Sequence, residues 1–235
     1  MKVALINGQN HKGSTYHIGR RLAEKLTDSA NIAEVFMPKD MPNFCLGCAR
    51  CIMEDEKLCP HYAHIEPITS IIDSADVLIF TSPVYVFHAT GSMKALLDHY
   101  AYRWMPHRPE EKMFTKQGVC ISTAAGAGMK STIKDMRDSL SFWGVGKIYS
   151  FGIAVNAIKW DEVPNKKIAK IKKRTDALAR AILRREGKAR PSLKTLLWFY
   201  GIRLMQKKPL NAVDGEYWKA KGWLGSARPW KSSRT

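Results

Sequence analysis

The sequence predicts an α/β protein: a doubly wound sheet of five parallel strands, followed by a basic helical C-terminal extension. Short apolar runs suited to buried strands alternate with segments whose apolar residues recur at helical spacing. This alternation is typical of a parallel sheet with helices on both faces. Charge is divided unevenly, with 17 Lys and Arg against 15 Asp and Glu in residues 1–155, and 21 against 6 in residues 156–235. We therefore expect a domain at 1–155 and an extension at 156–235.

The expected strands are five short apolar runs, at residues 3–7, 32–37, 76–82, 118–123 and 148–155. Helical spacing between them is found in three sets of apolar residues: Ile18, Leu22 and Leu26; Met93, Leu96, Leu97, Tyr100, Ala101 and Trp104; Met129, Ile133, Met136 and Leu140. Because crossovers between parallel strands are right-handed, two doubly wound topologies are the main candidates, Rossmann and flavodoxin-like.

The extension is expected to begin with a long basic helix at residues 162–186, whose inward residues are Ile168, Ile171, Leu178 and Ile182. Pro191 ends this pattern. A second helix then begins near Ser192, with one apolar stripe formed by Leu193, Leu196, Leu197, Tyr200 and Leu204. The tail DGEYWKAKGWLGSARPW contains three Trp, and we expect an irregular arm that docks through its aromatic residues, among them Tyr217, Trp218, Trp223 and Trp230.

The charge of the extension has two interpretations. It indicates an anionic partner, such as a membrane surface, nucleic acid or an acidic protein, or else a solvated helical face with the arm packed on a neighbouring subunit. We favour the subunit, keep the membrane surface as the alternative, and do not expect nucleic acid. The chain has no uninterrupted apolar run of membrane-spanning length, and its N-terminal residues show no signal-peptide pattern. We therefore expect a cytoplasmic protein with reduced cysteines.

The turn after the first strand, NGQNHKGST at residues 7–15, is polar and contains two glycines. It is not the G-x-G-x-x-G fingerprint of dinucleotide sites. Gly13 allows close backbone approach, and Ser14 and Thr15 offer hydroxyls where a helix begins, a position that favours an anion. His11 and Lys12 can add charge. The turn is thus either a simple connection or a phosphate cradle.

Two further loops follow strands whose carboxyl ends should lie at the same edge, where open parallel sheets bind ligands. In the first, Pro83 ends a strand and residues 84–87 form an apolar and aromatic segment. Such a segment needs a flat apolar partner, either a ring system or a dimer partner. In the second, TAAGAGM at 123–129, small residues and two glycines allow backbone amides to face a ligand.

Cysteine residues are concentrated in one motif, C-x2-C-x2-C-x7-C, formed by Cys45, Cys48, Cys51 and Cys59. Cys120 lies alone in an expected strand and is interpreted as a core residue. Disulfides are rare in the cytosol. The motif therefore has three interpretations: ligands of a cubane iron–sulfur cluster, a thiol loop without metal, or a zinc site completed by His61 or His64.

Together, INGQNHKGST, C-x2-C-x2-C, SPVY…GSMKALLD and STAAGAG resemble the NADPH-dependent FMN reductases and iron–sulfur flavoproteins of the flavodoxin-like superfamily, over about residues 1–155. The resemblance implies a flavodoxin-like fold, FMN as cofactor, and a homodimer or homotetramer with the flavin near a subunit interface. It implies FMN contacts from three loops: Gln9, His11, Lys12, Gly13, Ser14 and Thr15; Pro83, Val84, Tyr85 and Val86; Thr123, Ala124, Ala125, Gly126 and Gly128. Relatives often have G-S-x-R-x-x-N-T in the first loop, where this chain has Gln9 and His11 in place of the Ser and Arg. Iron–sulfur flavoproteins bind a [4Fe–4S] cluster through a compact motif of this kind.

The function that we favour is that of an NAD(P)H-dependent FMN oxidoreductase, which passes a hydride through the flavin to a small acceptor, quinone-like or free flavin. No side-chain acid or base is required. Tyr85 and Phe87 would shape the substrate pocket, and backbone N–H groups of residues 124–128 would stabilise charge on the reduced ring. Tyr85 and His88 are the candidate catalytic side chains, although His88 is also compatible with an ordinary loop position.

Two other functions fit the same residues. An iron–sulfur flavoprotein would pass single electrons to a redox-protein partner without a specific small substrate. A basic adaptor would use its extension to bind an anionic surface, with steep dependence on salt.

Overall fold

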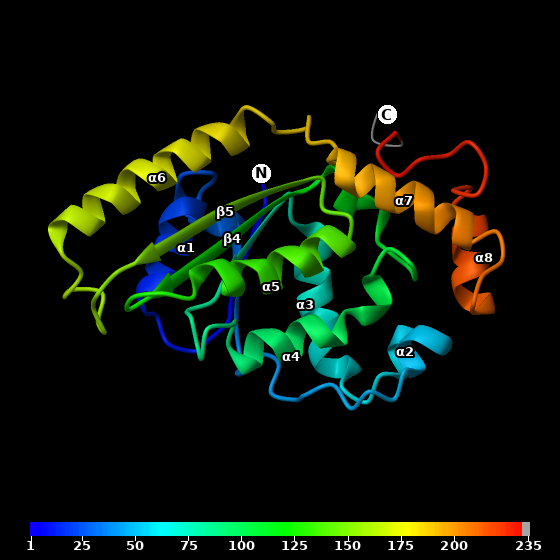
Figure 1. Cartoon of the computed structure of the whole chain (residues 1–235), viewed down its shortest axis with the longest axis horizontal. Coiled ribbons are helices and arrows are strands. Elements are labelled where there is room, and N and C mark those ends of the chain that lie inside the picture. The colour runs from blue at the N-terminus through cyan, green and yellow to red at the C-terminus, as the bar shows by residue number, and fades with distance from the viewer. Residues whose placement is uncertain (232–235) are drawn as a thin grey trace.

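The computed structural model describes residues 1–231, and its centre is a five-stranded sheet (Figure 1). The strands are β1 (Val3–Asn7), β2 (Ile32–Phe36), β3 (Val77–Thr81), β4 (Gln117–Ala124) and β5 (Lys147–Ala154). All neighbouring pairs are parallel, and the spatial order is β2-β1-β3-β4-β5. This is the flavodoxin-like order. The predicted fold class is confirmed, and each predicted strand agrees with its observed bounds to within about one residue at each end.

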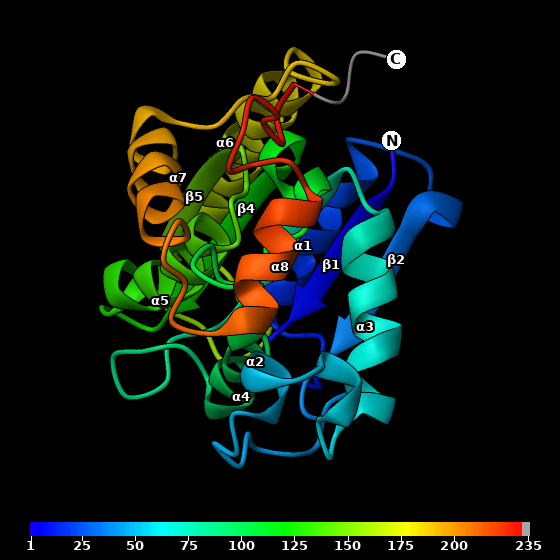
Figure 2. The same cartoon turned by 90° about the vertical axis from the view of Figure 1, so that its right-hand side faces the viewer.

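Helices cover both faces of the sheet, as Figures 1 and 2 show. One face carries α1 (Ser14–Glu24) and α6 (Asn165–Leu183), and the other carries α3 (Tyr62–Ser74), α4 (Gly91–His99) and α5 (Met129–Phe142). Successive strand residues point to opposite faces. Leu5 therefore packs among the residues of the first face, and Ile6 among those of the second. Burial on both faces explains why the central strands β1 and β3 are almost uniformly apolar, whereas the edge strands β2 and β5 are only partly buried.

Two elements of this domain differ from the sequence pattern. The pattern gives no helix between β2 and β3, but α3 lies there and buries Ile65, Ile68 and Ile72. Their helical spacing is obscured by Pro67 inside the helix, because proline usually marks a helix end. The helix expected to continue to Trp104 ends at His99 and is followed by a 3-10 turn, Ala101–Arg103.

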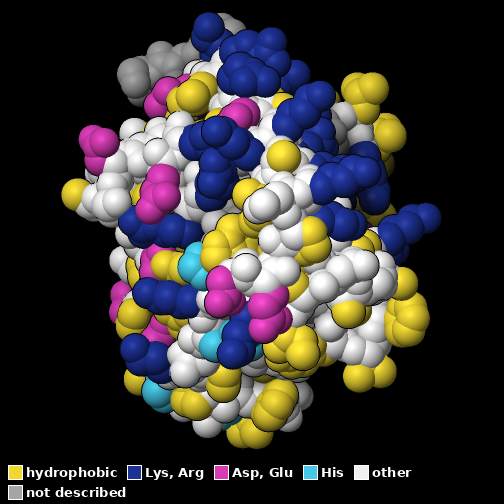
Figure 3. All heavy atoms as spheres, turned by 90° about the vertical axis from the view of Figure 1, so that its left-hand side faces the viewer, with side chains coloured by type: hydrophobic (Ala, Val, Ile, Leu, Met, Phe, Trp, Pro, Cys, Tyr) yellow, Lys and Arg dark blue, Asp and Glu magenta, His cyan; other side chains and the backbone are white. Residues whose placement is uncertain are grey.

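Helix α6, which the sequence pattern assigns to the extension, packs on the sheet beside α1, and its buried residues include Ile171, Leu178 and Ile182 as predicted. Lys and Arg side chains gather over this helix, in the upper part of the face shown in Figure 3. Helix α7 (Leu193–Met205) follows, and the Ser192 side chain caps it by accepting a hydrogen bond from the Thr195 backbone N–H at 3.2 Å. No helix within residues 1–231 is both long enough and apolar enough to cross a bilayer.

The tail is not the irregular arm that the sequence suggests. It contains α8 (Ala212–Ala220), which is capped by the Asn211 side chain. Trp218 and Trp223 are completely buried and pack against Phe114 and Phe199 in a third hydrophobic cluster. The expectation that the aromatic arm docks on a neighbouring subunit is therefore wrong for these two residues, because this chain itself supplies the surface that covers them.

Candidate active site

Three loops meet beyond the carboxyl ends of β1, β3 and β4, which are neighbours in the sheet. The first loop is hydrogen-bonded to the second, because the carbonyl oxygen of Gly8 accepts hydrogen bonds from Thr90 Oγ1 at 2.5 Å and from Ser92 Oγ at 2.8 Å. The second is fastened to the third, because the Val84 N–H donates to the Thr123 carbonyl at 2.9 Å. The loops therefore form one connected rim.

The N-terminus of α1 has the features of an anion-binding site. The helix has no side-chain cap and no acidic residue in its first turn, so its first N–H groups and its dipole are uncompensated. The Ser14 hydroxyl is buried there and has no hydrogen-bond partner among the described residues. Thr15 Oγ1 instead lies 2.6 Å from Thr123 Oγ1, which ties α1 to β4. Buried polar atoms are nearly always hydrogen-bonded, so the unpaired hydroxyl indicates a missing ligand.

Gln9 and His11, which replace the Ser and Arg of the pattern common in relatives, bond to each other rather than reaching into the loop as separate groups. Gln9 Nε2 lies 3.0 Å from His11 Nε2, and Gln9 Oε1 accepts a hydrogen bond from Tyr85 OH at 3.1 Å. Nε2 of His11 is therefore occupied by Gln9, whereas the arginine found in relatives would offer several N–H donors at this position.

The second loop ends in a tight turn, closed by two hydrogen bonds between the backbones of Tyr85 and His88, at 2.9 and 3.0 Å. Its central residues, Val86 and Phe87, have φ angles of 47° and 65°. Left-handed backbone is strained for a β-branched residue, and such strain is concentrated at functional sites. The side chains of Val86 and Phe87 are 94% and 65% exposed. The turn therefore presents apolar groups at the rim of the site, as the sequence suggests.

The third loop fits closely under this turn. Gly128 has a φ angle of 94°, and a Cβ atom at this position would lie 2.5 Å from Val84 Cγ1. Glycine is therefore required here. In the part of the chain that the structure describes, the N–H groups of residues 125–127 donate to no protein acceptor. They remain available to a ligand.

His88 is oriented by a residue that the sequence did not single out. Its Nδ1 lies 3.0 Å from Asp135 Oδ2, and the same carboxylate oxygen accepts the Ala89 N–H at 3.0 Å. This contact fixes the imidazole ring and leaves its Nε2 free for a ligand. Asp135 comes from α5, and its helical position alone gives no sign of this role.

The four cysteines of the motif lie in the segment between β2 and α3. Cys45 and Cys48 are exposed on an irregular segment, while Cys51 and Cys59 are half-buried. Burial raises the pKa of the Cys51 thiol to about 11, and negative charge on Cys59, Cys45 and Cys48 adds to the shift. Four cysteine thiolates are the ligand set that iron–sulfur clusters use, and a bound cation would balance their negative charge.

A second donor set shares one of these cysteines. Potential ligand atoms of Cys59, His61 and His99 all lie within 4.8 Å of one another. His99 Nδ1 lies 2.7 Å from the Ala95 carbonyl, so it carries its proton there, and its Nε2 lies 3.0 Å from His61 Nδ1. Burial lowers the pKa of His99, which favours the neutral ring that a metal requires. Of the two histidines that the sequence offered, His61 belongs to this group and His64 does not; His99 was not foreseen.

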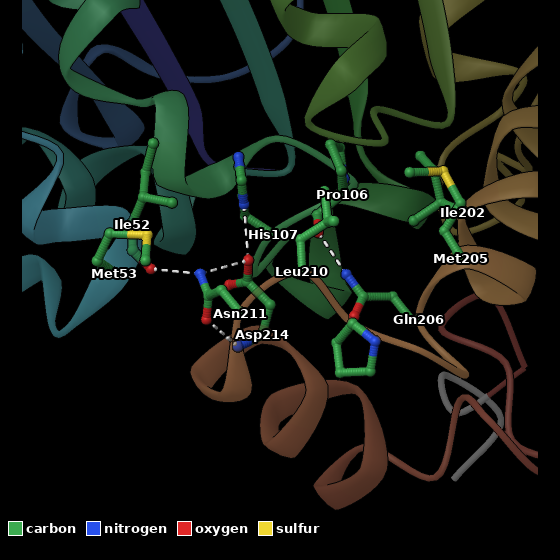
Figure 4. Close-up of a pocket in the computed structure, with 11 residues that line it drawn as sticks. Ile52, Met53, Pro106, His107, Ile202, Met205, Gln206, Leu210, Asn211 and Asp214 are labelled. Carbon is green, nitrogen blue, oxygen red and sulfur yellow. Dashed lines mark hydrogen bonds and ion pairs between the residues drawn. The ribbon is translucent and has the colours of Figure 1, made fainter.

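The extension clamps the helix that contains the third cysteine, α2 (Arg50–Met53). Arg108 donates from Nη1 to the Ile52 carbonyl at 3.0 Å and from Nη2 to the Cys51 carbonyl. The same guanidinium pairs with Asp214 at 2.7 Å. Asn211 donates to the Ile52 carbonyl and to Asp214, both at 3.0 Å. Figure 4 shows Asn211 and Asp214 between Ile52 and His107, beside a cavity of about 150 Å³, and Figure 2 shows α2 next to α8.

Residues 1–158 match the model of one protein family, described as NADPH-dependent FMN reductase. The chain belongs to this family. An iron–sulfur flavoprotein of Archaeoglobus fulgidus is 28% identical over 228 residues, which covers 86% of this reductase and 93% of the relative. An iron–sulfur flavoprotein of Methanocaldococcus jannaschii is 27% identical over 142 residues, covering 59% and 70% of the two chains.

Solved structures confirm the flavodoxin-like fold of the reductase. An FMN-dependent NADH-azoreductase from Bacillus anthracis superposes with a TM-score of 0.54 at 12% identity, covering 76% of this chain and 100% of that one. A flavone reductase superposes with a TM-score of 0.58 at 14% identity, covering 82% and 66%. Membership of the family makes this protein a flavin-dependent oxidoreductase.

The structure places every predicted FMN contact of the reductase on the connected rim: Gln9, His11, Lys12, Gly13, Ser14 and Thr15 on the first loop, Pro83, Val84, Tyr85 and Val86 on the second, and Thr123, Ala124, Ala125, Gly126 and Gly128 on the third. An uncapped helix start lies at one part of the rim and an exposed apolar turn at another. These features suit the phosphate and the ring of FMN, respectively.

Proposed function

We propose that the reductase binds FMN across the three loops, with its phosphate at the start of α1 and its ring against residues 83–86 and 123–128. NAD(P)H would be the hydride donor, and a quinone-like molecule or free flavin the acceptor. The observation that supports this best is the buried, unpaired Ser14 hydroxyl at an uncapped helix start. FMN, when bound, supplies the hydride-transfer chemistry, and the protein supplies position and electrostatics.

In this proposal the first loop binds the phosphate mainly through neutral donors. Ser14 Oγ and the first N–H groups of α1 donate to it, and Thr15 is held in place by Thr123. Lys12 adds a positive charge to the loop, and Nε2 of His11 is occupied by Gln9. Hydrogen bonds between neutral donors and an anion are stronger than those between neutral groups.

The other two loops serve the ring and the substrate. Val86 and Phe87 exclude water from one side and suit a flat apolar acceptor. The free N–H groups of residues 125–127 offer donors where negative charge develops on the ring. His88, oriented by Asp135, presents Nε2 as a proton donor to the reduced acceptor.

A mutation of Ser14 tests the phosphate site. Ser14→Ala should weaken FMN binding by roughly 1.5–3 kcal/mol, or about ten- to a hundredfold, measured by quenching of FMN fluorescence. Stability without FMN should not fall, since the hydroxyl has no protein partner. Thr15→Val should weaken both FMN binding and stability, because it also breaks the bond to Thr123. Ser139→Ala, in a buried position on α5, is the control. Unchanged FMN affinity in Ser14→Ala would exclude this loop from the site.

We further propose that Cys45, Cys48, Cys51 and Cys59 hold a [4Fe–4S] cluster. The proposal is supported by the four cysteines of the segment between β2 and α3 and by the iron–sulfur flavoprotein relative that aligns with 86% of the chain. A cluster would supply one-electron chemistry, so the acceptor would then include a redox-protein partner. Steady-state turnover with NADPH and a quinone distinguishes an enzyme with a small acceptor from a protein that only transfers electrons.

Metal analysis of protein purified without oxygen tests the cluster. About four irons per chain are expected, lost in Cys48→Ala while FMN is retained. About one zinc per chain that persists in Cys48→Ala and disappears in His99→Ala would instead assign a mononuclear site to Cys59, His61 and His99. Absence of both metals would leave a thiol loop.

A further inference from the structure

Helix α7 has an apolar face that the described chain leaves largely exposed. Thr195, Phe199 and Ile202 pack on the domain. The opposite face carries three leucines that are mostly in solvent, Leu193 at 81%, Leu197 at 75% and Leu204 at 62% exposed. Tyr200 lies on the same face and is 43% exposed, because Arg228 and Trp230 pack against its ring. These four residues follow the spacing i, i+4, i+7, i+11, so they form one continuous stripe. Figure 2 shows α7 at the outer edge of the molecule.

The exposed area is wider than the stripe. Trp198 and Met205 are 45% and 54% exposed on the adjacent side of the helix, and Leu210 just beyond it is 96% exposed. A groove of about 390 Å³ runs along α7 between Lys194, Leu197, Trp198 and Met205. A continuous apolar surface of this kind marks a binding face.

Charge indicates what covers this face. Between Glu186 and Asp214 the sequence contains no acidic residue, and it contains six basic ones: Lys188, Arg190, Lys194, Arg203, Lys207 and Lys208. Arg203 is occupied, because it donates to the carbonyls of Trp223 and Leu224 at 2.9 and 2.8 Å. Lys194, Lys207 and Lys208 are exposed beside the apolar stripe. Apolar side chains bordered by lysines are the composition of helices that lie in the interface of anionic membranes.

A second copy of the chain suits this face less well. An isologous dimer would place the same lysines of two subunits near each other across the two-fold axis, in a protein with a net charge of +17. Like charges at an interface oppose association. An anionic lipid surface instead complements the lysines and accepts the leucines. We therefore propose that α7 docks the reductase, lying flat, on an anionic phospholipid surface.

Vesicle flotation of the full-length protein tests this proposal. The protein should float with vesicles rich in phosphatidylglycerol and not with pure phosphatidylcholine vesicles, and binding should weaken as salt is raised. The double substitution Leu193→Glu with Leu197→Glu should lower the partition coefficient at least tenfold. Both side chains are exposed, so the fold and FMN content should be unchanged.

Two controls separate local docking from general attraction. Lys207→Glu with Lys208→Glu should lower binding at least tenfold, whereas Lys172→Glu with Lys173→Glu, an equal charge change on the exposed face of α6, should lower it by less than threefold. Equal effects of the two pairs would overturn the specific role of α7. Light scattering measures the oligomeric state of the same proteins. Loss of a dimer or tetramer in the leucine variant, without vesicle binding by the wild type, would overturn the proposal and identify α7 as a subunit interface.

Discussion

Asp214→Asn should uncouple the extension from the cysteine helix. Asp214 is 3% exposed, and its carboxylate lies 2.7 Å from both Arg108 and His107. The asparagine keeps the shape of the side chain but removes the charge that balances a buried guanidinium. The only other carboxylate recorded near that guanidinium in residues 1–231 is Glu56, at 3.9 Å and half exposed.

The magnitude follows from the burial of this pair. Breaking a buried ion pair by removing one partner costs about 3–5 kcal/mol, because the remaining charge is buried without compensation. Since Glu56 can move closer, we expect the lower end, about 3 kcal/mol. Urea unfolding at pH 7, followed by tryptophan fluorescence, measures this change, because Trp218 and Trp223 are completely buried in the same extension.

A second measurement follows the clamp itself. The backbone of α2 loses its anchors on the Cys51 and Ile52 carbonyls, so hydrogen exchange should increase in residues 50–53. Asp138→Asn is the matched control: Asp138 pairs with Lys134 on the surface and should contribute less than about 1 kcal/mol. If Asp214→Asn unfolds within about 0.5 kcal/mol of the wild type, the clamp is not important for stability and the reasoning is wrong.

Three further predictions concern a loop, the thiols and a buried lysine. Gly128→Ala should destabilise the protein by about 1–3 kcal/mol in thermal unfolding, since its φ is 94° and a Cβ would clash, whereas Gly126→Ala, with open space around it, should not. In metal-free protein at pH 8, the exposed Cys45 and Cys48 should react first with an aromatic disulfide. Cys120 should react only after unfolding, because it is buried and burial raises its pKa to about 12. Mass spectrometry identifies the order of modification, and early modification of Cys120 would contradict the prediction. Burial lowers the pKa of Lys116 to about 8 from 10.5, so the unfolded chain binds its proton more tightly and unfolding takes up protons between these values. The free energy of unfolding of the wild type, relative to Lys116→Met, should therefore rise by on the order of 2–3 kcal/mol from pH 8 to 10.5, and a flat difference would show that the lysine titrates normally.

The sequence by itself determined the sheet and the location of the site. The central strands β1 and β3 are buried on both faces, so their apolar runs are almost uninterrupted and their ends are marked by polar or small residues. Once the strands are parallel, their carboxyl ends must share one edge. The three loops after β1, β3 and β4 could therefore be brought together without any long-range information, and the structure confirms that they meet there.

The local sequence pattern gave a wrong prediction of secondary structure where two local signals in the same segment disagreed. Pro67 obscured α3, although Ile65, Ile68 and Ile72 have helical spacing. Glycines, prolines and aromatics in the tail suggested an irregular arm, but Asn211 caps a helix there and Trp218 finds a pocket in its own domain. In α7 the sequence shows apolar residues on nearly all sides, so it cannot say which side the domain uses.

Only the tertiary structure decided which side chains meet across the chain. Asp214 pairs with Arg108, His99 with His61, and Asp135 with His88. A residue's own neighbours in sequence fix its secondary structure, because backbone hydrogen bonds and side-chain spacing act over a few residues. Partners such as Arg108 and Asp214 are chosen only when whole elements pack and exclude water, since that exclusion is what makes an uncompensated charge costly and its counter-charge necessary.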